Sequence, residues 1–241
     1  MSTATLLFAL DGPLQSWGSK SNWTDRDTEA VPTKSGVLGM LAAALGWGRD
    51  QPLGDLAALR FGVRVESPGR VQVDFQTTLG YSRVDLERLG LEEDLSGYQG
   101  MIKADGTVDR TPDAVVSRRH YLMDAVFLGA LEGDRSDLEV LRGALAQPTY
   151  PMTLGRRSCI PARPPFLRGG LLDTDLDSAL RQYPAIKGHA TGTREAFIEL
   201  RPGEPERGTL VFNDQPVGTF RERRFRTRRV RRVWILPGAA L

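Results

Sequence analysis

The chain alternates short apolar runs with clusters of turn-forming residues, a pattern typical of many short strands and helices. Residues 3–10 form an apolar run with little polar interruption, which predicts a strand buried on both faces. The run stops at residues 11–13, Asp-Gly-Pro, a strong turn signal. Thr33 can cap a helix that begins near Lys34 and stops at Gly46. The apolar stripe of this helix consists of Val37, Leu38, Leu41, Ala42 and Leu45.

The same periodicity arguments predict the remaining elements. Further helices are expected near residues 55–59, 136–146 and 173–183. Further strands are expected at residues 61–66, 71–79, 117–131, 197–200, 209–212 and 230–236, with a turn at 213–216. Strands and helices in this order predict an α+β fold, a ferredoxin-like (RRM-like) sandwich.

The segment 82–117 differs from its surroundings. It is polar, contains glycines and has little aliphatic periodicity, and the tripeptide at residues 104–106, Ala-Asp-Gly, can close a hairpin. We therefore predict an inserted β-hairpin at 82–117, placed between a first part of the core at 1–81 and a second part at 118–241.

Composition adds an asymmetry of charge. The chain has 241 residues, 40% of them hydrophobic, which is enough for a sizeable core. The net charge is only +2, but residues 1–120 carry 13 Lys and Arg against 16 Asp and Glu, whereas residues 121–241 carry 19 against 14. Such a split indicates that one face meets an acidic partner.

Several classes of protein are disfavoured by what the chain lacks. A single cysteine excludes an intramolecular disulfide and a cysteine-rich zinc site. His120 and His189 lie far apart and outside any metal-ligand spacing, so we expect neither a metal nor a cofactor. The first twelve residues lack the pattern of a signal peptide, and no apolar run approaches the ~18 residues of a membrane span. We expect a soluble cytoplasmic protein with no membrane partner.

The segment 150–165, YPMTLGRRSCIPARPP, is the most informative part of the chain. Gly155 allows backbone conformations that are closed to other residues and a close approach to a ligand. Arg156 and Arg157 follow it, and guanidinium groups bind phosphate through a planar fork. Ser158 adds a hydroxyl, and prolines frame both ends. The combination predicts a preformed anion-binding loop for a nucleic-acid backbone, with a solvated surface turn as the alternative.

A second basic stretch lies near the end of the sequence. Residues 221–232, RERRFRTRRVRR, hold eight arginines opposed only by Glu222. One interpretation is a ribbon that follows phosphates, with Phe225 interleaved for stacking. The alternative is a solvated edge strand protected by its charges.

Two further turns could contribute to a nucleic-acid site. After the first strand, Trp17 could stack on a base and Gln15 could read a base edge beside Ser16, although Trp17 could equally fill the core beneath its loop. Lys34 and Ser35 stand at the predicted helix start, which is a general phosphate site, or an ordinary capped helix. The upstream glycine spacing of an NTPase loop is absent.

Catalysis has weaker support. His120 lies beside two arginines and Tyr121, and a metal-independent ribonuclease could use such groups. A lone histidine on a predicted strand is more often structural or solvated. Asp25, Asp27 and Glu29 are interrupted by Arg26 and do not form the carboxylate cluster of a two-metal nuclease.

These residues together resemble the CRISPR-associated RAMP family, and within it the CasD-type subunits of type I-E Cascade complexes. Five segments carry the resemblance: LLFALDGPLQSWG, PTKSGVLGMLAAALG, RRHYLMDAVF, YPMTLGRRSCIPARP and FRTRRVRRVWIL. They extend from residue 6 to residue 236, so the resemblance covers nearly the whole chain. The first, second and fourth are specific in combination.

The resemblance implies a ferredoxin-like RAMP core with a projecting hairpin thumb, matching the insertion predicted at 82–117. It implies a non-catalytic subunit that caps the 5′ handle of the crRNA in antiviral defence. It also implies protein partners, a backbone subunit (CasC-like) and a large subunit (CasA-like). A relative in type I-C systems cleaves repeat RNA, so a repeat-processing endoribonuclease stays open as the alternative. The implied handle contacts are Gln15, Ser16, Trp17, Lys34, Ser35, Gly155, Arg156, Arg157 and Ser158.

Overall fold

The computed structural model describes residues 3–19, 24–78, 101–102, 108–109, 115–187, 192–205 and 207–238. The predicted hairpin turn at 104–106, most of the insertion predicted at 82–117, and His189 lie outside the described residues. Contacts divide the chain into two units. Unit 1 comprises Met1–Ser19, Asp27–Gln72 and Tyr121–Leu241, and unit 2 comprises Lys20–Arg26 and Val73–His120.

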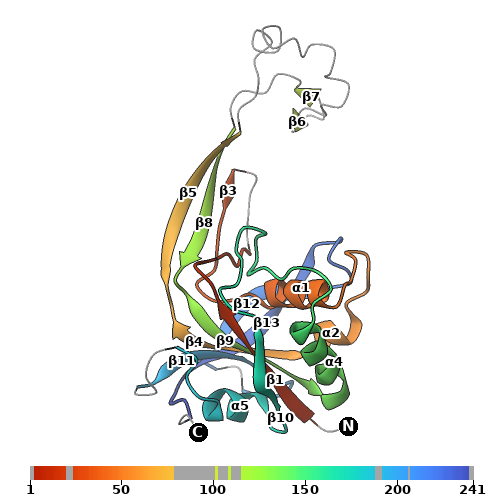
Figure 1. Ribbon diagram of the computed structural model, residues 1–241, viewed down its shortest axis with the longest axis vertical. Helices are drawn as coiled ribbons and strands as arrows, with labels where there is room; N and C mark the ends of the chain where they lie inside the picture. Colours follow the sequence, from red (N-terminus) through yellow and green to blue (C-terminus); the bar gives the residue numbers. More distant parts are fainter. Residues whose placement is uncertain are drawn as a thin grey trace. The chain divides into compact units, whose positions relative to one another are not determined.

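Unit 1 is built on one seven-stranded sheet in which all neighbouring strands are antiparallel (Figure 1). In spatial order its strands are β10 (Phe166–Leu172), β1 (Thr3–Asp11), β9 (Val126–Asp134), β4 (Arg60–Ser67), β11 (Arg194–Glu199), β13 (Arg224–Ile235) and β12 (Leu210–Val217). The chain is thus a mixed α+β protein with mostly antiparallel sheets, as the order of predicted elements indicated.

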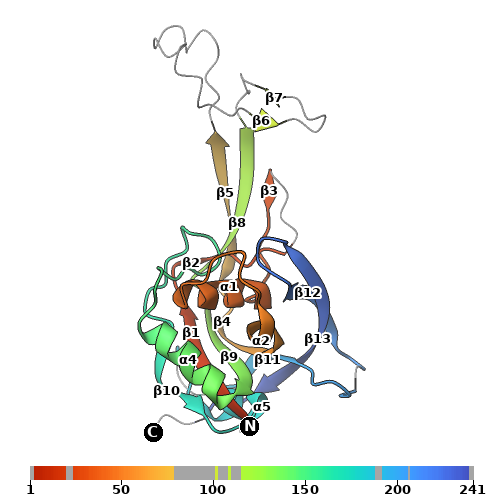
Figure 2. The same cartoon turned by 90° about the vertical axis from the view of Figure 1, so that its right-hand side faces the viewer.

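Helices cover both faces of this sheet (Figures 1 and 2). One face carries α1 (Lys34–Ala44), α2 (Gly54–Ala58) and α4 (Arg135–Ala146), and the other carries α5 (Leu176–Gln182). Leu6 and Phe8 of β1 pack into the core on the α1 side, whereas Leu7 packs with α5. This confirms that the apolar run at 3–10 is a strand buried on both faces.

The predicted start of the first helix is also confirmed. Thr33 is the N-cap of α1, and its hydroxyl accepts a hydrogen bond from the Gly36 amide. Helices predicted near 55–59, 136–146 and 173–183 correspond to α2, α4 and α5.

Two local predictions were wrong, and one strand of the large sheet was missed. The apolar segment at 117–131 is two strands, β8 (Val115–Met123) and β9, separated where Asp124 adopts φ 56°. The turn expected at 213–216 lies inside β12, whose register with β13 shifts between Phe212 and Gln215, so its polar residues belong to an irregular edge strand. Strand β10 was not predicted, because its two adjacent glycines interrupt the apolar pattern.

Smaller ladders complete the described structure. In unit 2, β3 (Asp25–Arg26) pairs in parallel with β8, and β6 (Met101–Ile102) pairs with β7 (Val108–Asp109). Strand β5 (Arg70–Thr78) also pairs with β8. Within unit 1, β2 (Leu14–Gln15) pairs with the end of β8.

A buried arginine ties α5 to the sheet. Arg64 of β4 is fully buried, and desolvation lowers the pKa of its guanidinium while Glu66 opposes that shift. It contacts Glu66 at 2.7 Å and donates to the carbonyl oxygens of Tyr183 and Pro184, each at 2.7 Å. It also donates to the carbonyl oxygen of Leu180. The guanidinium therefore binds backbone carbonyls at the end of α5 that have no hydrogen-bond partner within the helix.

Arg64→Met is expected to destabilise unit 1 by about 3–5 kcal/mol, because Glu66 and the carbonyls would lose their buried partner. Urea unfolding followed by circular dichroism measures this loss. Arg70→Met, at an exposed position, serves as the control and should change the midpoint little. Equal unfolding midpoints for the two variants would contradict the anchoring role of Arg64.

Candidate functional site

The arginine loop, defined as residues 150–165, folds against the turn that follows β1. Within the loop, Leu154 N–H donates to Cys159 O at 2.8 Å, and Cys159 N–H donates to Arg156 O at 2.9 Å. Between the two turns, Ser16 N–H donates to Leu154 O at 3.0 Å. The structure therefore brings the arginine loop and the turn that contains Trp17 side by side.

Gly155 makes this close approach possible. Its φ is +94°, and a Cβ at this position would lie 1.7 Å from the Ser16 carbonyl oxygen. No side chain fits here without separating the two turns. The glycine is thus required by the packing of the loop, whether or not a ligand approaches it.

The two adjacent arginines have different surroundings. Arg156 is half-buried, its guanidinium lies 4.9 Å from the centroid of the Tyr121 ring, and it donates to Asp27 O at 3.2 Å. Arg157 and Ser158 are exposed. Cys159 behind them is buried, and burial raises the pKa of its thiol, so it is a packing residue.

The side chains of Gln15 and Trp17 are buried and form a hydrogen bond with each other. Trp17 is only 1% exposed, and its Nε1 donates to Gln15 Oε1 at 3.0 Å. Gln15 Nε2 donates in turn to the carbonyls of Leu10 at 3.1 Å and Ala125 at 2.7 Å. The structure supports the second interpretation of Trp17, in which the ring fills the core beneath its loop.

Lys34 also points inward. Its side chain is buried, with Nζ 3.1 Å from both carboxylate oxygens of Glu199. Desolvation lowers the pKa of this ammonium group, and the nearby Glu199 carboxylate opposes that shift. The Lys34 amide donates to Asp214, which also holds Arg228 through two hydrogen bonds of 2.6 and 2.8 Å. Ser35 beside it is only partly buried.

The basic stretch at 221–232 is not a uniform track of free charges. Arg228 is buried and forms an ion pair with Asp214, and Arg231 forms ion pairs with Asp177 and Glu204. Three more of its arginines pair with carboxylates: Arg221 with Asp50, Arg224 with Glu222 and Arg232 with Glu195. Five of the eight arginines thus pair with carboxylates, and Arg228, Arg231 and Arg232 link β13 to other parts of unit 1.

Three other arginines meet at a surface hollow of about 580 Å³ beside α1. The cationic hollow, as we call it, is lined by Arg49, Arg157 and Arg223 together with Trp47, Tyr150 and Phe220. All three arginines are exposed, and among the described residues their guanidinium groups make no ion pair. Small residues of α1, Gly39, Ala42 and Ala43, line the hollow as well.

Packing explains how the hollow is assembled from distant segments. Arg221 N–H donates to Arg49 O at 3.1 Å, which holds the β12–β13 connection against the segment after α1. Arg223 adopts φ 49°, a sparsely populated conformation for a non-glycine residue. Arg157 was predicted as a site residue from the sequence, whereas Arg49 and Phe220 were missed because only the fold brings them to the arginine loop.

The described residues contain no group of three His, Cys, Asp or Glu side chains that could hold a metal ion. In unit 2, His120 Nδ1 lies 3.8 Å from Asp25 Oδ1. No helix in the described part of the chain is long and apolar enough to cross a membrane.

Gly155→Ala is expected to destabilise the loop by more than ~2 kcal/mol, because it adds a backbone clash to the cost of a positive φ. Trypsin should then cut faster after Arg156 and Arg157. The matched control is Gly169→Ala, since Gly169 has φ +73° but open space around it and carries only the conformational cost. Equal trypsin cleavage rates for the two variants would show that the contact with Ser16 is unimportant.

The chain is similar to known CRISPR-associated proteins. Residues 5–231 match Cas_Cas5d, the CRISPR-associated protein family Cas_Cas5. The CRISPR system Cascade subunit CasD of Escherichia coli (strain K12) is 33% identical over 190 residues, covering 76% of this chain and 78% of that protein.

Two solved structures share the fold over nearly the full length. A chain from a crystal structure of a Cas protein has a TM-score of 0.71 and 38% identity, covering 98% of both chains. A chain of a CRISPR RNA-guided surveillance complex has a TM-score of 0.72 and 32% identity, covering 98% of this chain and 91% of that one. With a family match over most of its length and relatives above 30% identity, the chain belongs to the Cas_Cas5 family of CRISPR-associated proteins.

Proposed function

We propose that this protein is a non-catalytic RNA-binding subunit of a type I-E Cascade complex that caps the 5′ handle of the crRNA. The similarity to a Cascade subunit and to a chain of an RNA-guided surveillance complex supports the assignment to a Cascade complex.

The cationic hollow is the observation that carries the proposal. Three exposed arginines without carboxylate partners among the described residues converge there, next to the exposed Tyr150 and the partly buried Trp47 and Phe220. Guanidinium groups bind phosphates, and aromatic rings provide platforms for unpaired bases. Tyr150 is 53% exposed and is the aromatic side chain of the hollow that we propose for stacking on a base.

The handle contacts divide into two kinds in this proposal. Gly155, Arg156, Arg157 and Ser158 form the surface that meets RNA. Gln15, Trp17 and Lys34 support that surface from beneath, because their polar atoms are bonded inside the protein. Ser16 contributes through its backbone contact with the loop, and the partly buried Ser35 contacts the handle at the start of α1 in this proposal.

We also propose that the first half of the large sheet is a ferredoxin-like core. The strands β1, β4, β9 and β10 and the helices α1 and α4 follow each other as βαββαβ, and the four strands lie in the order β10-β1-β9-β4. This order is the basis of the proposal. The insertion at 82–117 is proposed as the thumb, contacting a CasC-like backbone subunit, with a CasA-like large subunit nearby.

The non-catalytic assignment rests on chemistry as well as homology. Cleavage of RNA without a metal needs a general base to activate a hydroxyl group. Among the residues that line the cationic hollow there is no histidine and no carboxylate, and Tyr150 is the one lining side chain of a type that can act as a general base. We infer that a bound phosphodiester is held there beside positive charge without being cleaved.

Replacing Arg49, Arg157 and Arg223 together by glutamine is expected to weaken binding of a labelled crRNA roughly ten- to hundred-fold, because three phosphate contacts are lost. The slope of log affinity against log salt should fall by about 2, since each contact to single-stranded RNA contributes ~0.7. Fluorescence anisotropy over a salt series measures both quantities.

The matched control replaces Arg142, Arg168 and Arg181, which are also exposed, by glutamine. It removes the same net charge from α4, β10 and α5 rather than from the hollow. If both triple variants lose affinity equally, RNA binding depends on overall charge and the hollow is not the site.

Purified protein incubated with labelled CRISPR repeat RNA and EDTA is expected to leave that RNA intact, because the hollow contains no histidine or carboxylate to act as a general base. Gel electrophoresis of the products is the measurement. Site-specific cleavage that disappears in His120→Ala would favour the endoribonuclease alternative instead.

A further inference from the structure

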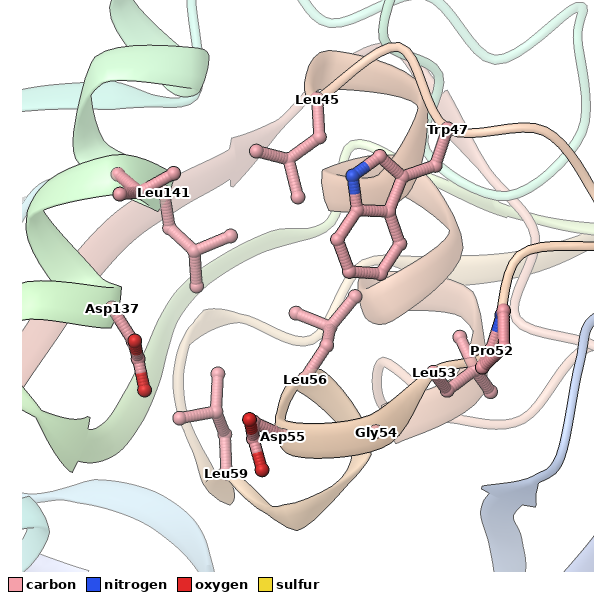
Figure 3. A pocket seen from close by; sticks show the side chains of 11 residues that line it. Leu45, Trp47, Pro52, Leu53, Gly54, Asp55, Leu56, Leu59, Asp137 and Leu141 are labelled. Carbon is pink, nitrogen blue, oxygen red and sulfur yellow. The ribbon is translucent and has the colours of Figure 1, made fainter.

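A second surface depression lies between α1, α2 and α4 and has the opposite chemical character. It is an apolar pocket of about 370 Å³, shown in Figure 3. Leu45, Leu56 and Leu141 come from three different helical segments and point into it, and the Trp47 ring forms a wall. Val140 on α4 is 62% exposed and extends the apolar surface beyond the pocket.

An acidic hollow of about 530 Å³ adjoins this pocket. The two share Asp55, Leu59 and Asp137, and the acidic hollow continues to Glu132 and Asp134. Figure 3 shows Asp55 and Asp137 on the same side of the pocket as Leu59. Together they make one docking groove, apolar at one end and negatively charged at the other.

The charges at the acidic end are not all neutralised from within the protein. Glu132 is held by Arg60 and Arg201. Asp55 and Asp137, however, form no ion pair among the described residues. Each lies in the first turn of a helix, where the helix dipole stabilises a negative charge. The helix dipole explains why acidic residues stand at these helix starts. It does not pair the two carboxylates with a cation.

This combination selects one kind of occupant. Phosphate groups would be repelled by the carboxylates, so the groove is unsuited to RNA. An apolar side chain would bury the leucine-lined pocket, and a neighbouring lysine or arginine would meet Asp55 and Asp137. We propose that the docking groove binds a segment of another protein in which a large apolar side chain stands close to a basic residue.

Photo-crosslinking in the assembled complex tests this proposal, which does not depend on the RNA-capping function. Val140 is replaced by p-benzoylphenylalanine, the complex is purified with its RNA and irradiated, and the crosslinked peptide is sequenced by mass spectrometry. The expected product is a peptide of a different protein with a large apolar residue and Lys or Arg within a few positions. Adding Asp55→Asn and Asp137→Asn should lower its yield about three-fold at low salt.

The matched control carries the same crosslinker at Val211, which is 59% exposed on β12 and lies outside the groove. A Val140 yield no higher than that at Val211 would overturn the proposal. A crosslink to RNA, to a second copy of this chain, or to a peptide without a basic residue would overturn it as well, because each identifies a different occupant.

Discussion

Burial of β1 on both faces is the constraint on which the architecture of unit 1 depends. The strand lies between β10 and β9, with α1 and α4 packed on one side and α5 on the other. Because its successive side chains enter two different cores, neither helical layer can be removed without exposing it. The turn that leaves β1 is then held at a defined place, and Ser16 in that turn meets the arginine loop.

Arginine serves two different purposes in this chain. Arg64 and Arg228 are buried, and each is satisfied by carboxylates, with backbone carbonyls added for Arg64. A buried guanidinium needs such partners because desolvation of an unpaired charge is costly. Exposed arginines without carboxylate partners are instead available to an external anion. The cationic hollow is distinguished by the convergence of three such arginines at one place.

The segment after α1 connects two surfaces of opposite charge. Trp47 lines both the cationic hollow and the apolar pocket, so one aromatic side chain contributes to each. Arg49 lies on the hollow side, and Asp55 lies on the groove side. The two proposals assign RNA to one of these surfaces and a protein segment to the other, and opposite charges on neighbouring surfaces favour that discrimination.

Sequence patterns were sufficient for the elements whose signals are local. The two-faced strand at 3–10, the Thr33 cap and the glycine–arginine loop could all be predicted, because alternation, capping and turn chemistry depend on residues close together in the chain. The pattern did not show which polar side chains face inward. Lys34 and Gln15 looked like ligand contacts, but partners more than a hundred residues away hold them inside. The cationic hollow likewise needed the fold, since Arg49, Arg157 and Arg223 are distant in sequence and meet only where long-range packing brings three segments together.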